Sequence, residues 1–345
     1  MIYTFSMEQV DFAKEADLTY EQKVAVQREE ALLRDYPEMK KFEEQGRKYI
    51  NEENQGSIVK LLEDCRRAWG PVAPLVLLKV LMPEIVCKYE QKGIEEPIRR
   101  ATLSDIGLWA TEYEDQNKTI GLDRFSWLSH HMVAKILRLG RLQFEEGIFS
   151  FPYRIAMDNG LIRIFADEGI KCDKQGYITK GIPSFITRRN NEVDTEKGII
   201  RQEEAERTAL SFVLQQGDPV IRIHIPKGES FSKEKVDDSL VMARQRYPKA
   251  HFICDSWLLD PMLDEVLEEQ SNCVQFMRRF KKFPLSQGTP QIYERVFGFG
   301  ATREDILQWN CTTRLQQRVQ TLVRQGRQFH TTGGILPIVQ GQERC

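Results

Sequence analysis

The strongest constraint on the fold is a strand–helix–strand pattern in the second half of the chain. Val220–Ile225 reads Val-Ile-Arg-Ile-His-Ile, a β-branched run that Pro226 stops. Ser232 is a good N-cap for a helix that runs to about Tyr247. Ala250–Cys254 is a second short strand. Two short strands joined by a crossover helix predict a βαβ unit, and therefore parallel strands.

The chain before this unit has two patterns that meet near Gly140. The first part indicates helices, with apolar residues three and four apart in Ser57–Trp69, Val72–Tyr89 and Leu103–Asn117. We predict a further helix over Asp123–Leu139, with Asp123 as N-cap and Gly140 just past its end. The predicted domains are residues 1–140, which are helical, and residues 141–345, which form a mixed α/β or α+β domain.

Short β-prone runs follow Gly140. Those expected to form a meander are Arg141–Glu145, Phe151–Met157, Leu161–Phe165, Tyr177–Thr179, Ser184–Arg189 and Ile199–Gln202. Asn159 and Gly160 separate two of them and predict a tight hairpin, and a turn is expected over Asp194–Gly198.

The last 90 residues mix strand and helix patterns. Helix is expected over Leu259–Leu267 and Asn272–Phe280, and a strand over Gln291–Phe297. A capping-box spacing predicts one more helix, from Thr302 to Gly326, and Gly333–Ile338 predicts a closing strand.

Composition excludes several classes of protein. Apolar residues make up 41% of the 345 residues and the net charge is −2, which is typical of a soluble globular protein and argues against a nucleic-acid binder. The seven cysteines are scattered without C-x-x-C spacing, which favours a reducing cytoplasm. The most apolar stretch, Val72–Val86, is too short and too interrupted to cross a membrane.

The charge is unevenly distributed. Residues 1–56 hold 13 acidic and 8 basic side chains, whereas residues 278–345 hold 4 acidic and 11 basic ones. The basic end includes Arg278, Arg279, Lys281, Lys282, Arg314, Arg318, Arg324 and Arg327. These charges fit either a solvated helix face or an anion-binding side of the second domain.

The loop between the first strand and the helix of the βαβ unit is a candidate anion site. A helix N-terminus after a strand presents backbone N–H groups to a phosphate. Lys227 adds a charge, and Gly228 allows close approach to the backbone. An ordinary surface loop is the alternative, because neither a P-loop nor a G-x-G-x-x-G motif is present.

The carboxyl ends of the two strands carry the other candidate residues. His224, on the same strand face as Arg222, could act as a general base, or be a hydrogen-bonded core histidine. Ligands of open α/β sheets gather at such strand ends. The second strand leads into Asp255, Ser256 and Trp257, with Asp260 beyond. Here the alternative is structural: Trp257 in the core and Ser256 as a helix cap.

Other site chemistries are disfavoured. No G-x-S-x-G motif indicates an α/β-hydrolase, and no H-E-x-x-H motif or other His/Cys cluster indicates a metal site, so we expect none. Cys254 is expected to be a small buried residue rather than a nucleophile.

The strings GDPVIRIHIPKGESFSKEKVDDSL and HFICDSWLLDPMLDEVLEEQSNCVQFMRRF resemble the C-terminal domain of a bacterial family of two-domain acyltransferase-like proteins. The segment up to Gly140 resembles that family's helical N-terminal domain. The resemblance implies a GNAT-like sheet domain flanked by helices, in the superfamily of acyl-CoA N-acyltransferases. It makes Val220–Ile225 the fourth strand of that fold, residues 226–232 the pyrophosphate loop and Ala250–Cys254 the fifth strand.

The loop departs from the superfamily signature Arg/Gln-x-x-Gly-x-Gly/Ala, because it holds a single glycine. The residues that the resemblance assigns to acyl-CoA are Ile225, Lys227, Gly228, Glu229, Ser230, Phe231 and Ser232. Two functions remain open: an N-acyltransferase, and a non-catalytic GNAT-like module that binds or senses a ligand.

The predicted reaction is transfer of an acyl group to the amine of a small-molecule or peptidic acceptor. Acetyl-CoA is the expected donor and another acyl-CoA the alternative. His224 would act as base, with Ser256 and Asp255 as further catalytic residues, while Arg222, Trp257 and Asp260 would line the substrate cleft. Neither the acceptor nor the oligomeric state follows from the sequence.

Overall fold

The computed structural model describes residues 10–158, 161–166, 199–200, 212–285, 291–298 and 300–337. The chain divides into two compact units, Met1–Phe144 and Glu145–Cys345. The expected turns at Asn159–Gly160 and Asp194–Gly198 lie outside the described residues, as do the expected strands Tyr177–Thr179 and Ser184–Arg189.

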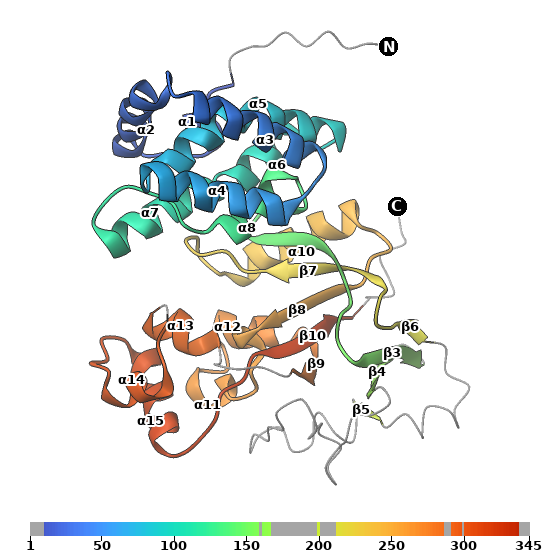
Figure 1. Cartoon of the computed structure of the whole chain (residues 1–345). Helices are drawn as coiled ribbons and strands as arrows, with labels where there is room; N and C mark the ends of the chain where they lie inside the picture. The colour runs from blue at the N-terminus through green and yellow to red at the C-terminus, as the bar shows by residue number, and fades with distance from the viewer. Residues whose placement is uncertain are drawn as a thin grey trace. The chain divides into compact units, whose positions relative to one another are not determined.

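The first unit is a group of packed helices, as predicted (Figure 1). They are α1 (Phe12–Glu15), α2 (Tyr20–Leu33), α3 (Pro37–Asn51), α4 (Gln55–Trp69), α5 (Ala73–Gln91), α6 (Glu96–Leu103), α7 (Asp105–Asn117) and α8 (Phe125–Met132). Helices α4, α5 and α7 confirm the three predicted from apolar spacing. Helix α5 is the centre of the unit: Leu75, Leu78, Leu81 and Ile85 on it are fully buried, and α2, α3 and α4 all pack against it.

The prediction of a helix over Asp123–Leu139 is wrong for the second half of this segment. Helix α8 ends at Met132, Ala134 adopts a left-handed φ of 50°, and a strand, β1 (Ile136–Leu139), follows. All four residues of β1 are buried, a pattern that a helix with one apolar face does not give. The left-handed conformation of Gly140 (φ 69°) belongs to the two-residue turn into β2 (Leu142–Ile148) and not to a helix end.

The second unit is built on two sheets and flanking helices (Figure 1). Its strands are β3 (Tyr153–Asp158), β4 (Leu161–Ala166), β5 (Ile199–Ile200), β6 (Phe212–Leu214), β7 (Pro219–His224), β8 (Phe252–Ser256), β9 (Lys281–Pro284) and β10 (Thr332–Leu336). Its helices are α10 (Lys233–Arg246), the 3₁₀ turn η1 (Trp257–Leu259), α11 (Leu263–Val266), α12 (Asn272–Met277), α13 (Gln291–Phe297), α14 (Arg303–Gln308) and α15 (Arg314–Arg324).

The larger sheet has the strand order β1-β2-β7-β8-β10-β9, and the smaller one β5-β4-β3-β6. Strands β7 and β8 are parallel, so the predicted βαβ unit is confirmed, with α10 as its crossover helix and Ser232 as N-cap. Strand β10 confirms the predicted closing strand and pairs antiparallel with β8 and β9. The mixed sheet after a helical region makes the chain an α+β protein.

The two sheets of this unit pack through one apolar cluster. Val220, Ile253 and Ile335 from the larger sheet meet Tyr153 and Ile164 from the smaller one, each at most 2% exposed. Because side chains alternate along a strand, every second residue of β7 and β8 faces this cluster.

Two expectations near the C-terminus are corrected. Gln291–Phe297 is helix α13 and not a strand; its β-branched and aromatic residues favour a strand, but Tyr293 and Phe297 lie four residues apart and are both buried, which suits a helix face. Two helices, α14 and α15, form where a single helix is expected from Thr302 to Gly326. A second capping box, at Thr313, starts α15. The capping box predicted at Thr302 is present and begins α14.

Gly333 on β10 offers a test of this packing. A Cβ atom at Gly333 would lie 2.2 Å from the ring of Phe283. We therefore expect Gly333→Ala to lower the free energy of unfolding by about 1–3 kcal/mol, measured by urea denaturation. In a Phe283→Ala background the added methyl group has room and should cost less. Equal costs in the two backgrounds would contradict the contact.

Candidate active site

The site begins where strands β7 and β8 end. Their parallel ladder joins Ile221 to Phe252 and Arg222 to Ile253. The residues at the carboxyl end of each strand, up to His224 and Ser256, follow these pairs. This edge of a parallel pair is where open α/β sheets bind ligands.

Four polar side chains gather there from three neighbouring strands. Nε2 of His224 on β7 lies 2.9 Å from Oε2 of Glu145 on β2. A guanidinium nitrogen of Arg222, also on β7, lies 3.4 Å from Oδ1 of Asp255 on β8. All four are partly or fully buried: the Glu145 side chain is 10% exposed, that of Asp255 31%. The strands thus hold two carboxylate–cation pairs side by side, His224 being a cation when protonated.

Burial and neighbouring charge act on Asp255 together. Burial raises the pKa of Asp255, and the charge of Glu145 adds to this, while Arg222 and His224 oppose it; the net direction is upward.

Arg222 is fixed by more than its ion pair. Its guanidinium donates to the carbonyl oxygen of Ile148 and to the hydroxyl of Ser150, and lies 5.7 Å from the ring centre of Phe151. Phe151 belongs to an aromatic cluster with Phe149, Tyr153 and Phe283. The polar group therefore borders an aromatic wall on the same side of the sheet.

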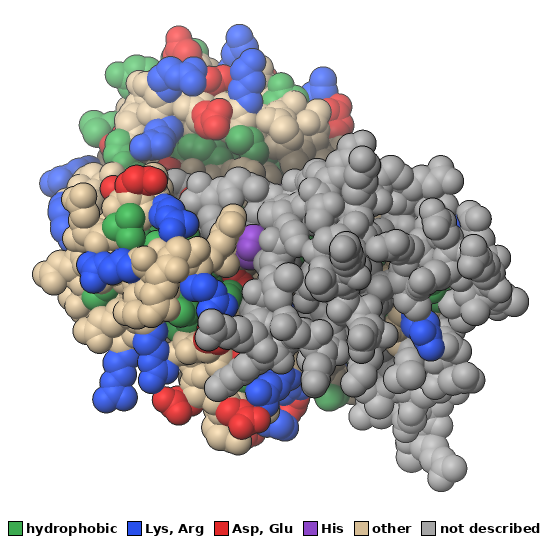
Figure 2. Space-filling view, turned by 90° about the horizontal axis from the view of Figure 1, so that it is seen from below, with side chains coloured by type: hydrophobic (Ala, Val, Ile, Leu, Met, Phe, Trp, Pro, Cys, Tyr) green, Lys and Arg blue, Asp and Glu red, His purple; other side chains and the backbone are tan. Residues whose placement is uncertain are grey.

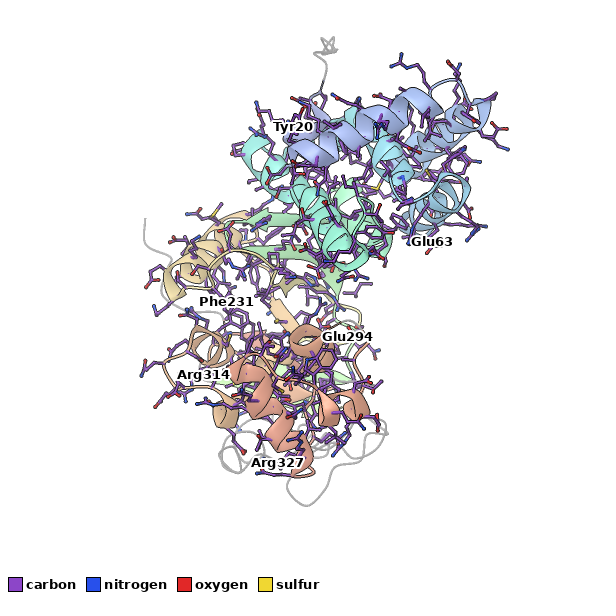
Figure 3. All side chains as sticks on the ribbon, turned by 90° about the vertical axis from the view of Figure 1, so that its left-hand side faces the viewer. Tyr20, Glu63, Phe231, Glu294, Arg314 and Arg327 are labelled. Carbon is purple, nitrogen blue, oxygen red and sulfur yellow. The ribbon has the colours of Figure 1, made fainter. Side chains whose placement is uncertain are left out.

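The loop after β7 leads straight into α10. Gly228 has φ 112°, a conformation that favours glycine, and Lys227 and Ser230 are exposed beside it. The Ser232 hydroxyl accepts from the backbone N–H of Lys235 and caps the helix. Phe231, labelled in Figure 3, packs its ring 5.1 Å from that of Phe276 on α12 and so anchors the loop.

The start of α10 favours negative charge. The pKa of the exposed Glu234 is lowered, first by its own backbone N–H and then by the Ser232 hydroxyl. Glu229, the acidic residue of the loop, lies 2.9 Å from the Lys235 ammonium, which offsets its charge.

The other predicted site residues, which lie at the end of β8 and just after it, make hydrogen bonds that stabilise the following turn. Ser256 follows Asp255 and faces the other side of the sheet; its hydroxyl accepts from the N–H of Leu258 and caps η1. The N–H of Trp257 donates to the side chain of Gln291. Asp260 is fully buried, and its carboxylate accepts from the backbone N–H groups of Met262 and His330.

The structure thus brings together His224, Arg222 and Asp255, but not Ser256 or Asp260, on one sheet face. Sequence reasoning missed Glu145. Its only local signal is the alternation of Gln143 and Glu145 with apolar residues, and its partner lies 79 residues away on a strand that is not its sequence neighbour.

The basic end of the chain is engaged in structural pairs. Arg278 contacts Asp264 and Glu269, Arg318 contacts Glu268, and Arg327 contacts Glu265. Figure 3 shows Arg314 and Arg327 near the two ends of α15. On the described surface, Lys and Arg side chains lie among Asp and Glu (Figure 2). These contacts support the solvated-face alternative for the basic residues.

Two absences hold for the residues that the structure describes. They contain no group of three or more His, Cys, Asp or Glu side chains arranged to hold a metal ion. None of the helices they form is long and apolar enough to cross a bilayer.

Family models match almost the whole chain. A model described as "N-acyltransferase N-terminal domain" matches residues 7–133, and one described as "GNAT-like C-terminal domain" matches residues 136–336. The chain belongs to the family of two-domain, GNAT-like N-acyltransferases. The resemblance recognised in its sequence is confirmed. A comparison with curated protein sequences gives no match.

Solved structures share the fold of this GNAT-like chain. One is an acyltransferase mutant in complex with octanoyl-CoA, 17% identical, covering 95% of this chain and 87% of that one with a TM-score of 0.57. Another is an acyltransferase in complex with decanoyl-CoA and teicoplanin, 18% identical, covering 94% and 86% with a TM-score of 0.57.

Asp260 yields a prediction on the pH dependence of stability. Burial raises the pKa of Asp260 to about 7, so its contribution to folding is complete below pH about 4 and is lost as pH rises to about 7. Burial lowers the pKa of His330 to about 4. The contribution of His330 to stability therefore rises with pH between about 4 and 6.5. The two effects oppose each other.

Asp260→Asn removes the first effect and leaves the second. The free energy of unfolding of this variant should therefore rise more steeply between pH about 4.5 and 6.5 than that of the wild type, measured by urea denaturation at each pH. Parallel curves would show that Asp260 ionises as in the unfolded chain.

Proposed function

We propose that this chain is an acyl-CoA-dependent N-acyltransferase, which moves an acyl group from the thioester of acyl-CoA to an amine. The observation that carries the proposal is the end of the β7–β8 pair, where His224 faces a cluster of charged groups directly before the capped start of α10. Membership of a family of N-acyltransferases supports it.

Acyl-CoA would bind at the loop after β7. Its pyrophosphate would lie against the backbone of Ile225–Ser232 at the start of α10, with Lys227 as a further charge. Gly228 keeps the approach to the backbone open. The pairing of Glu229 with Lys235 lessens the repulsion that an acidic residue in this loop would otherwise exert on the pyrophosphate. The pantetheine arm would pass between the ends of β7 and β8.

The charge of the site suits an acceptor amine. With His224 neutral and both carboxylates ionised, Glu145, Asp255 and Arg222 sum to one negative charge. Such a site attracts an ammonium group. The acceptor is proposed as a small-molecule or peptidic amine, and acetyl-CoA remains the first donor to test among acyl-CoAs of increasing chain length.

The proposed reaction needs few groups from the protein. His224 takes one proton from the acceptor ammonium, and the free amine attacks the thioester carbon. The C–N bond forms, a tetrahedral oxyanion develops, and the C–S bond breaks as the carbonyl re-forms. The second amine proton goes to the departing thiolate, which leaves as CoA; Ser256 is not part of this step, because its hydroxyl lies on the other side of the sheet and caps η1. Holding amine and thioester in line supplies much of the rate.

Replacing His224 should separate chemistry from binding. We expect His224→Gln to lower kcat by about 10²–10⁴-fold, the usual contribution of a general base, with little change in the Kd of acyl-CoA. Thiol release from acyl-CoA in the presence of an amine panel measures kcat, and calorimetry measures Kd. His251→Gln, on the loop before β8, is the matched control. An unchanged kcat would remove His224 from the mechanism.

Replacing Lys227 should act on binding instead. We expect Lys227→Glu to weaken the calorimetric Kd of acyl-CoA and of free CoA by about tenfold or more, because a charge-assisted contact to phosphate is replaced by repulsion. Lys249→Glu makes the same charge change at another exposed position of the unit and should leave Kd unchanged. Absence of binding by any CoA species to the wild type would favour a non-catalytic module.

A further inference from the structure

The Glu145–His224 contact has the geometry of an orienting pair. The carboxylate oxygen lies 2.9 Å from Nε2 of the imidazole, and the two side chains are 10% and 28% exposed. Both residues stand on strands that are neighbours in the sheet, which holds their side chains to the same face. Imidazole rings that act as bases commonly need a second group to set their tautomer and orientation.

Two other charged groups near His224 on this sheet face, Asp255 and Arg222, contact each other. Asp255 on β8 acts electrostatically on His224, but its Oδ1 lies 3.4 Å from the guanidinium of Arg222. Arg222, on the same strand as His224, is itself held by Ile148 and Ser150. Asp255 is thus paired with Arg222, and Glu145 contacts the imidazole.

We propose that Glu145 is a positioning residue of the site: it accepts the Nε2 proton of His224, leaves the basic lone pair on Nδ1, and stabilises the imidazolium that forms. This inference rests on the proposed function. In the step concerned, an N–H bond of the acceptor ammonium breaks, an N–H bond forms at Nδ1, and the amine keeps the electron pair that it uses for attack. The carboxylate stays ionised throughout.

The neighbouring residue on β2 supplies a matched control. Glu146 carries the same charge one position further along, but it is exposed and faces the other side of the strand. Glu145→Gln keeps the size of the side chain and removes its charge, whereas Glu145→Asp keeps the charge on a side chain that is one methylene shorter. Glu146→Gln removes an equal charge from the strand without touching His224.

The first measurement is by NMR and does not depend on turnover. The chain has five histidines, so ¹⁵N-histidine labelling gives a simple spectrum, in which His224→Gln assigns the signals of His224. We expect a protonated Nε2 with a downfield proton that exchanges slowly with water, because a hydrogen bond to a carboxylate is short and strong. Glu145→Gln should speed this exchange, and Glu146→Gln should not. An unprotonated Nε2, or exchange that Glu145→Gln leaves unaltered, overturns the inference.

The second measurement is kcat/KM for acyl transfer, with the KM for acyl-CoA determined separately. We expect Glu145→Gln to lower kcat/KM by about 10-fold or more, within the range that a general base contributes, with the KM for acyl-CoA nearly unchanged. Glu145→Asp should restore part of the rate, which a purely structural loss would not predict.

The outcomes separate this inference from the proposed function. If the wild type transfers acyl groups and Glu145→Gln matches it in kcat/KM, only the role of Glu145 is wrong. If the wild type transfers no acyl group from any acyl-CoA to any amine, both proposals fail.

Discussion

The parallel pairing of β7 and β8 is the constraint on which the site depends. Parallel strands need a crossover, and the crossover helix α10 must begin just after β7 ends. This one requirement places the helix N-terminus, the Gly228 turn and the carboxyl ends of both strands at the same edge of the sheet. The start of a helix, where backbone N–H groups are unpaired, and a group of ionisable side chains thus become neighbours through topology.

The second constraint is electrostatic. Burying four ionisable side chains on one sheet face is costly unless they are paired. Here each carboxylate lies beside a different partner, Glu145 beside His224 and Asp255 beside Arg222. The pairs are held by strands and not by loops, and the ring of Phe151 covers one side of Arg222. Such rigid, pre-oriented groups suit proton transfer, because little reorganisation is needed during the reaction.

Much of the fold could be predicted from the sequence where local signals agree with tertiary packing. The β-branched run before Pro226 and the Ser232 cap identify β7 and α10, and apolar spacing identifies α4, α5 and α7. The predictions fail where burial on several sides removes the expected period: the sequence pattern of β1 fits the end of a helix, and that of α13 fits a strand. The pattern of apolar side chains alone cannot distinguish a helix from a strand when a short segment is buried.

The candidate site was only partly predictable, for a different reason. Strand ends are visible in sequence, so His224, Arg222 and Asp255 could be proposed together. Glu145 could not, because the order β2-β7 places it beside a strand far along the chain. Ser256 and Asp260 follow β8 directly, yet their oxygens accept backbone N–H groups of the following turn. Proximity in sequence to a strand end does not decide which face a side chain takes.

A structure of the full chain in complex with a non-hydrolysable acyl-CoA would locate the donor site. We expect the pyrophosphate to lie against the backbone of residues 226–232, the pantetheine between the ends of β7 and β8, and the thioester carbonyl within reach of His224. CoA bound elsewhere on the chain, or with its acyl end remote from His224, would show that acyl transfer does not take place at the ends of β7 and β8.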